Sequence, residues 1–101
     1  MTEKHKYYTA RLALCDKVLA EINGINVAVS EELKISPVPT DAVPTDDELI
    51  AAIGKIDARL TRLSHAVSVD EAVAAIADIN TFLGIVAAAK RDAEAMLSSL
   101  I

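Results

Sequence analysis

The stretch VPTDAVPTDDELIAAIGKI, residues 38–56, marks the border between two kinds of chain. Its first part contains two prolines, which lack a backbone donor and push the residue before each of them toward an extended conformation. In its second part, Thr45 and Glu48 have the spacing of a capping box, in which each side chain binds the backbone amide of the other residue. The stretch therefore predicts that a connector ends and a helix begins at about residue 46.

The tripeptide Pro-Thr-Asp occurs twice in this stretch, and the two copies have different interpretations. The second copy starts the helix, because Asp46 and Asp47 then lie at the positive end of the helix dipole. The first copy has Val43 where a capping box needs Glu or Gln, so a turn is predicted there. A recognition motif repeated in a proline-rich linker is the less favoured alternative.

Outside the connector, apolar residues recur at the spacing of amphipathic helices. The first helix is expected over residues 3–23, because Asn23-Gly24 is a pair typical of helix C-termini. The second is expected over residues 46–65 and the third over residues 69–98. The predicted fold class is all-α: a small antiparallel bundle of three main helices, with a long proline-containing crossover between the first helix and the second.

The acidic connector predicted over residues 25–44 contains all three prolines and is long for a link inside a compact domain. Its first residues, INVAV at 25–29, are β-branched and predict a short extended piece. Ser30 and the two glutamates after it predict one turn of helix in SEELK, residues 30–34. We expect residues 1–101 to form a single helical domain, because a chain of this length suits one core.

The third predicted helix is longer than the other two, which leaves two alternatives for its second half. Either it bends at Gly84, a weak helix former, or it stays straight and extends beyond the bundle. An extending end would expose an apolar face that binds a partner. The residues of this expected face are Val86, Ala89, Ala93, Met96, Leu97 and Leu100.

Asn80 is a polar residue within the apolar stripe of the third helix. Such a residue can fix the register of an oligomer through a hydrogen bond to its counterpart in another copy. The alternative is an asparagine at the border of the stripe that faces water.

Residues that carry catalysis are scarce. His5 and His65 have no companion at metal-ligand spacing, and Cys15 falls on the apolar stripe of the first helix. The three glycines are isolated, so a phosphate-binding loop is excluded. We therefore expect no enzyme activity, no metal and no cofactor.

Composition and cysteine content indicate the cellular compartment of the protein. Hydrophobic residues make up 52% of the chain and charged residues 25%, which excludes wholesale disorder. The apolar run FLGIVAAA, residues 82–89, is too short to span a membrane, and MTEKHKYY at the start predicts no secretory signal. We expect a cytoplasmic protein, because a single cysteine excludes an internal disulfide.

The formal net charge is −5, and the acidic excess is concentrated in and just after the connector. This distribution argues against direct binding of nucleic acid, which requires a basic face. An acidic surface formed by Asp41, Asp46, Asp47 and Glu48 would instead suit a basic site on another protein. A solvated linker that keeps the protein soluble is the alternative.

The function predicted from these features is a non-enzymatic protein–protein interaction module: an adaptor, assembly factor or inhibitor that acts by packing of helix faces. Its partner would be another protein or a second copy, and we expect a homodimer. The alternative is a phage-type inhibitor such as an anti-CRISPR protein, by analogy of size, charge and missing catalytic residues, which blocks a basic nucleic-acid-binding site with its acidic surface. No membrane partner is expected.

Overall fold

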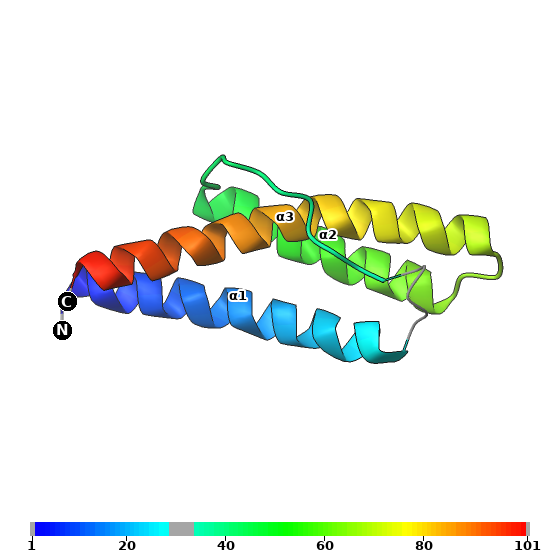
Figure 1. Ribbon diagram of the computed structural model, residues 1–101, viewed down its shortest axis with the longest axis horizontal. Coiled ribbons are helices and arrows are strands. Elements are labelled where there is room, and N and C mark those ends of the chain that lie inside the picture. The colour runs from blue at the N-terminus through cyan, green and yellow to red at the C-terminus, as the bar shows by residue number, and fades with distance from the viewer. Residues whose placement is uncertain (1, 29–33, 101) are drawn as a thin grey trace.

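The computed structural model describes the backbone of residues 2–28 and 34–100, and the side chains of these residues except 26–28. In this described part the chain forms three helices and no strand. The helices are α1, Glu3–Ala28; α2, Asp46–Ser64; and α3, Val69–Ser99. They pack into a small all-α bundle (Figure 1), which confirms the predicted fold class.

The long helix α3 is the common packing partner of the other two. Both α1 and α2 pack against α3, whereas α1 and α2 barely touch each other. Figure 1 shows that α1 and α2 run in the same general direction and that α3 runs in the opposite direction. The bundle is therefore open along the side where α1 and α2 face each other.

The start of α2 has the predicted capping box. The Thr45 hydroxyl accepts from the Glu48 backbone amide at 3.2 Å, and the Glu48 carboxylate accepts from the Thr45 backbone amide at 3.1 Å. The helix ends at Ser64, with His65 as the residue that caps it. Because these contacts join residues close in sequence, the local pattern was sufficient to predict them.

The C-terminal end of α1 was predicted incorrectly. The helix continues through Asn23 and Gly24 to Ala28, and no glycine in the described part has the positive φ of a helix-ending residue. Ile25 explains the continuation, because its side chain packs against the core one turn beyond Ile22. The extended piece predicted over residues 25–29 is thus wrong for its first four residues.

The one-turn helix predicted over residues 30–34 lies outside the described residues, apart from Lys34. The connector that follows has no regular secondary structure from Lys34 to Thr45. It contributes Ile35 to the core, where only 3% of this residue is exposed.

The helix α3 is continuous through Gly84 and bows gently along its length (Figure 1). Its second half does not extend beyond the bundle, because α1 lies beside it and Lys90 of α3 pairs with Asp16 of α1 at 2.9 Å. By length and composition alone α3 is apolar enough to cross a membrane, a test that core helices of soluble proteins also pass. In this structure it supplies the centre of the core.

The core is aliphatic and draws on all three helices. Full burial of a large aliphatic side chain contributes about 1.5 to 3 kcal/mol, so these residues supply the main stabilisation. The buried apolar residues of the cluster are Cys15, Val18 and Ile22 of α1, Ile35 of the connector, Leu49 and Ile56 of α2, and Ile76, Ile79, Leu83, Val86 and Ala89 of α3.

Candidate functional site

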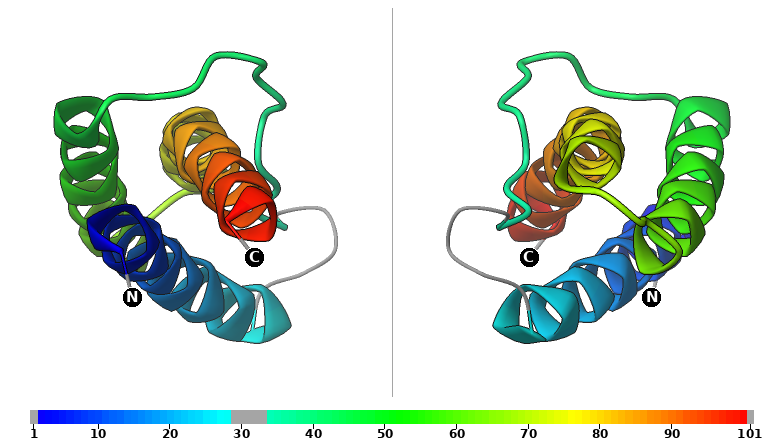
Figure 2. Two further views of the ribbon diagram at one scale, coloured as in Figure 1. Left: turned by 90° about the vertical axis from the view of Figure 1, so that its left-hand side faces the viewer. Right: turned by 90° about the vertical axis from the view of Figure 1, so that its right-hand side faces the viewer.

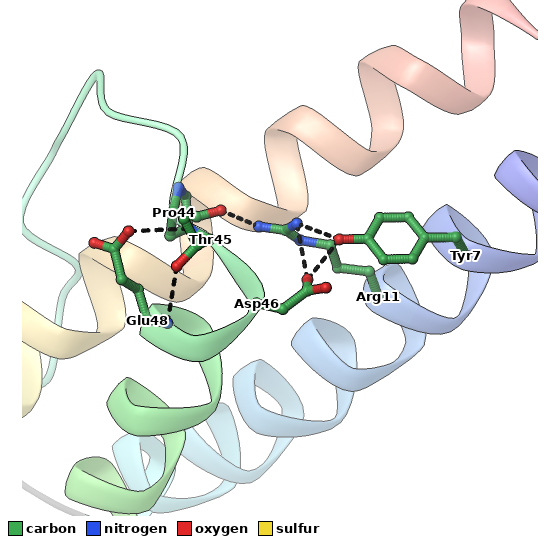
Figure 3. A network of polar contacts seen from close by, with 6 residues as sticks. All are labelled: Tyr7, Arg11, Pro44, Thr45, Asp46 and Glu48. Carbon is green, nitrogen blue, oxygen red and sulfur yellow. Dashed lines mark hydrogen bonds and ion pairs between the residues drawn. The ribbon is translucent and has the colours of Figure 1, made fainter.

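Arg11 connects α1 to the start of α2. Its side chain is only 8% exposed, and its guanidinium donates to the Asp46 carboxylate at 3.1 Å and to the Pro44 carbonyl at 2.5 Å. Tyr7 completes this Arg11 cluster, because its hydroxyl accepts from Arg11 at 2.9 Å and donates to Asp46 at 2.5 Å (Figure 3). These contacts hold the N-terminus of α2 against α1.

In the Arg11 cluster, the positive charge of Arg11 is paired with the negative charge of Asp46. The hydrogen bond to Asp46 raises the pKa of Tyr7 above its usual value, while Arg11 acts in the opposite direction. The Tyr7 hydroxyl therefore stays protonated at neutral pH and acts as a donor. The buried Nε of Arg11 has no hydrogen-bond partner among the described residues, a cost that the three other bonds of the guanidinium offset.

An apolar groove of about 260 Å³ lies between α1 and α2 beside this cluster. Leu49 is buried within it, whereas Tyr7, Leu14 and Ile50 are 42%, 38% and 63% exposed. Large exposed apolar side chains gathered around one groove are typical of a surface that binds another molecule. The lining residues of this α1–α2 groove are Tyr7, Ala10, Arg11, Leu14, Asp46, Leu49 and Ile50.

The four acidic residues predicted to form a binding surface have two different environments. Asp46 belongs to the Arg11 cluster, and Glu48 caps the N-terminus of α2. Asp41 and Asp47 are exposed, and neither forms an ion pair with another described residue. Two of the four carboxylates are therefore held by intrachain contacts, and two are open to solvent.

The apolar face predicted on the second half of α3 is mostly covered by α1. Met96 and Leu97 are half-buried, and Leu100 is 38% exposed at the helix end. The expectation that this whole face is exposed is wrong, because the N-terminal half of α1 lies beside it, as the pairing of Asp16 with Lys90 shows. Three of its residues have no exposed surface: Val86, Ala89 and Ala93.

Asn80 binds the connector of its own chain. Its side-chain oxygen accepts from the Ser36 backbone amide at 2.8 Å, and its backbone carbonyl accepts from the Val38 amide at 3.0 Å. These two bonds fix the register of the connector along α3. A contact from Asn80 to a second copy would compete with them for the side-chain oxygen.

Gly84 lies one turn after Asn80 and lets the connector pass close to α3. A Cβ at Gly84 would overlap the carbonyl oxygen of Val38. Further along, Arg91 donates to the Thr40 carbonyl at 2.8 Å. Figure 2 shows the connector on the side of α3 opposite α2, so these contacts are separate from the α1–α2 groove.

A metal site and a reactive thiol each have structural requirements, and the described part of the chain meets neither set. No three His, Cys, Asp or Glu side chains there lie together in a way that could hold a metal ion. Cys15 is fully buried, and burial raises the pKa of its thiol, which favours the unreactive protonated form.

The sequence pattern did not identify Arg11 or the groove beside it. The available signal was the spacing of Arg11 and Cys15, because an arginine four residues before a buried cysteine shares its helix face. Leu14 borders the groove, next to this helix face. Ile50 had no assigned role.

Comparison with known proteins does not assign the site. The chain matches no known protein-family model, and no curated protein or solved structure is significantly similar to it. The function is therefore inferred from the geometry and chemistry of the groove.

Proposed function

We propose that this protein is a non-enzymatic protein–protein interaction module that binds a helix of another polypeptide in the α1–α2 groove. The observation that carries the proposal is the exposure of Tyr7, Leu14 and Ile50 around an apolar groove between two helices that barely touch. Covering these side chains would remove apolar surface from water, which is the main driving force of protein association. Adaptors, assembly factors and inhibitors all act through surfaces of this kind.

A helix is the form of polypeptide that suits this groove best. The groove is bordered by two helices that run in the same general direction (Figure 1), so a third helix could pack its side chains between theirs. An amphipathic helix in an apolar groove is a common mode of recognition, with anchors at helical spacing. The Arg11 cluster would keep the two walls of the groove in place before binding, which lowers the entropic cost of association.

The alternative function is an inhibitor of the anti-CRISPR type that blocks a basic site with an acidic surface. Fewer residues support it. Asp46 and Glu48 have intrachain partners, so such a surface would depend mainly on Asp41 and Asp47. A basic target would then bind in a salt-sensitive way. Unchanged target binding after Asp41→Asn and Asp47→Asn together would rule this alternative out.

The groove proposal can be tested by photo-crosslinking in the cells that produce the protein. A photoreactive phenylalanine derivative would replace Leu14 or Ile50 in the groove. Matched controls would carry it at Val67 and Val73, which are 88% and 49% exposed outside the groove. We expect discrete protein adducts from the two groove positions only. Adducts from all four positions, or none from the groove, would contradict the proposal.

A further inference from the structure

The exposed surfaces of α1 and α2 on either side of the groove are complementary to each other. We infer that the partner is a second copy of this chain, related to the first by a two-fold axis parallel to the helices, so that the two grooves face each other and two partner helices, instead of one, cover each groove. This inference rests on the proposed function and adds the identity of the partner. A two-fold dimer buries the same patch on both copies, so the patch has to be complementary to itself.

Each of the two helices that border the groove carries an exposed stripe at helical spacing, and Ala10, Leu14 and Ile50 of these stripes line the groove itself. The stripe on α1 has a lysine at each end with apolar residues between, and the stripe on α2 has an aspartate at each end with Ile50 and Gly54 between. All eight residues are exposed. The α1 stripe is Lys6, Ala10, Leu14 and Lys17, and the α2 stripe is Asp47, Ile50, Gly54 and Asp57.

The two stripes match in length and in level. At a rise of about 1.5 Å per residue, the lysines are separated by about 16 Å and the aspartates by about 15 Å along their helices. The stripes also start at the same level, because Tyr7, next to Lys6, bonds to Asp46, next to Asp47. The four charged residues make no ion pair with any described residue of their own chain.

Charge selects one of the two ways in which the groove could face a copy of itself. A two-fold axis parallel to the helices places α1 of one copy over α2 of the other at the same level. Lys6 then faces Asp47 and Lys17 faces Asp57, twice in each dimer. An axis perpendicular to the helices would place α1 over α1, with lysine facing lysine, which is unfavourable.

Gly54 provides a separate reason for a neighbouring helix at this place. It lies in the middle of α2, where glycine destabilises a helix relative to alanine. A Cβ at Gly54 would meet no atom of the chain within 4 Å, so packing inside one copy does not require glycine. A second backbone approaching at this position does require it, because a glycine allows the close approach of another backbone.

Charge exchange tests the pairing directly. One variant carries Lys6→Glu and Lys17→Glu, and the other carries Asp47→Lys and Asp57→Lys. Each variant alone places like charges across the inferred interface, whereas an equimolar mixture restores attraction at every pair. Light scattering should give the wild-type protein twice its chain mass of 10.7 kDa. We expect each variant alone to dimerise at least about tenfold more weakly and the mixture to recover the dimer.

Two further variants separate this outcome from general effects. Lys34→Glu with Arg62→Glu makes the same change of net charge as the Lys6 and Lys17 variant, at exposed residues outside the stripes, and should leave the dimer intact. Gly54→Leu adds bulk where the single chain is open, so it should keep the helix content while abolishing the dimer. If a charge variant fails to fold, the mass of Gly54→Leu in light scattering still tests whether the dimer forms through this surface.

Three results would overturn the inference: a wild-type mass of one chain up to concentrations on the order of 100 µM, a dimer that none of these variants weakens, or a mixture that stays dissociated. The first of these results leaves the proposed function intact if the groove crosslinks to a different protein. The proposed function fails by itself when Leu14 and Ile50 positions give no protein adduct at all.

Discussion

The carbonyl oxygen of Val38 occupies the space that a side chain at Gly84 would fill. One turn earlier on α3, Asn80 accepts two hydrogen bonds from the same stretch of connector. The glycine leaves room for the connector and the asparagine supplies polar contacts to it. Together they allow the connector to pack closely against α3. This close contact explains why a glycine, a weak helix former, stands in the middle of α3. The helix is continuous at Gly84.

Gly84 and Gly54 predict opposite results for the same substitution. Gly84→Ala should lower the free energy of unfolding by about 1 to 3 kcal/mol, because the connector has to move away from the added methyl group. Gly54→Ala should raise it by about 0.5 to 1 kcal/mol, because the position is open and alanine favours the helix. Urea unfolding at a concentration where the chain is a monomer would measure both. Equal effects of the two changes would contradict the packing role of Gly84.

The side chain of Asn80 acts only as an acceptor toward Ser36, which distinguishes two substitutions at this position. Asn80→Ala should cost about 1 kcal/mol, because the Ser36 amide loses its partner. Asn80→Asp keeps an oxygen in the same place and should cost less. Thr81→Ala is the neighbouring control, since the Thr81 hydroxyl bonds only within α3. Thermal unfolding of the three variants would show whether Asp rescues; if Asp is as damaging as Ala, the bond does not stabilise the fold.

The features that could be predicted from the sequence are those built from residues close together in the chain. The capping box of Thr45 and Glu48 spans three residues, and its pattern alone located the start of α2. The end of α1 was different, because the helix continues past Gly24 to a residue, Ile25, that packs on the core. The exposed face predicted on α3 has a different origin: it rests on the length of α3, and helix lengths alone do not show that α1 packs beside residues 86–97, where Asp16 pairs with Lys90.

The Arg11 cluster and the groove depend on contacts that no local pattern encodes. Tyr7 and Asp46 are 39 positions apart in the chain, and Arg11 and Asp46 are 35 apart. An arginine on a core face indicates a buried partner but does not identify it. The acidic residues at the start of α2 were therefore interpreted as a surface for other proteins, although Asp46 has a partner inside the chain.

Tyr7 gives a prediction for alkaline pH. Its pKa is raised above 10.0 mainly by the hydrogen bond to Asp46, so the folded state holds this proton more tightly than the unfolded state does. Its contribution to stability is then complete below pH 10 and is lost as the pH rises through the folded-state pKa.

A single-tyrosine protein makes this shift measurable. In Tyr8→Phe, Tyr7 is the only tyrosine, so ultraviolet absorbance of the phenolate should titrate with a midpoint above 10.0. Adding Asp46→Asn removes the main cause and should move the midpoint down. A midpoint that does not respond to Asp46→Asn would show that the bond drawn in Figure 3 does not control Tyr7 in solution.

Ile50→Asp provides the sharpest separation of binding from folding. The side chain of Ile50 is 63% exposed, so a charge there should change the free energy of unfolding by less than about 1 kcal/mol. In a complex the same carboxylate would be desolvated against apolar surface, and affinity should fall by at least about tenfold. Val67→Asp is the matched control, because Val67 is 88% exposed and lies outside the groove. Sedimentation or titration against the crosslinked partner, alongside circular dichroism, would report both quantities. Loss of affinity in both variants, or in neither, would show that the groove is not the binding surface.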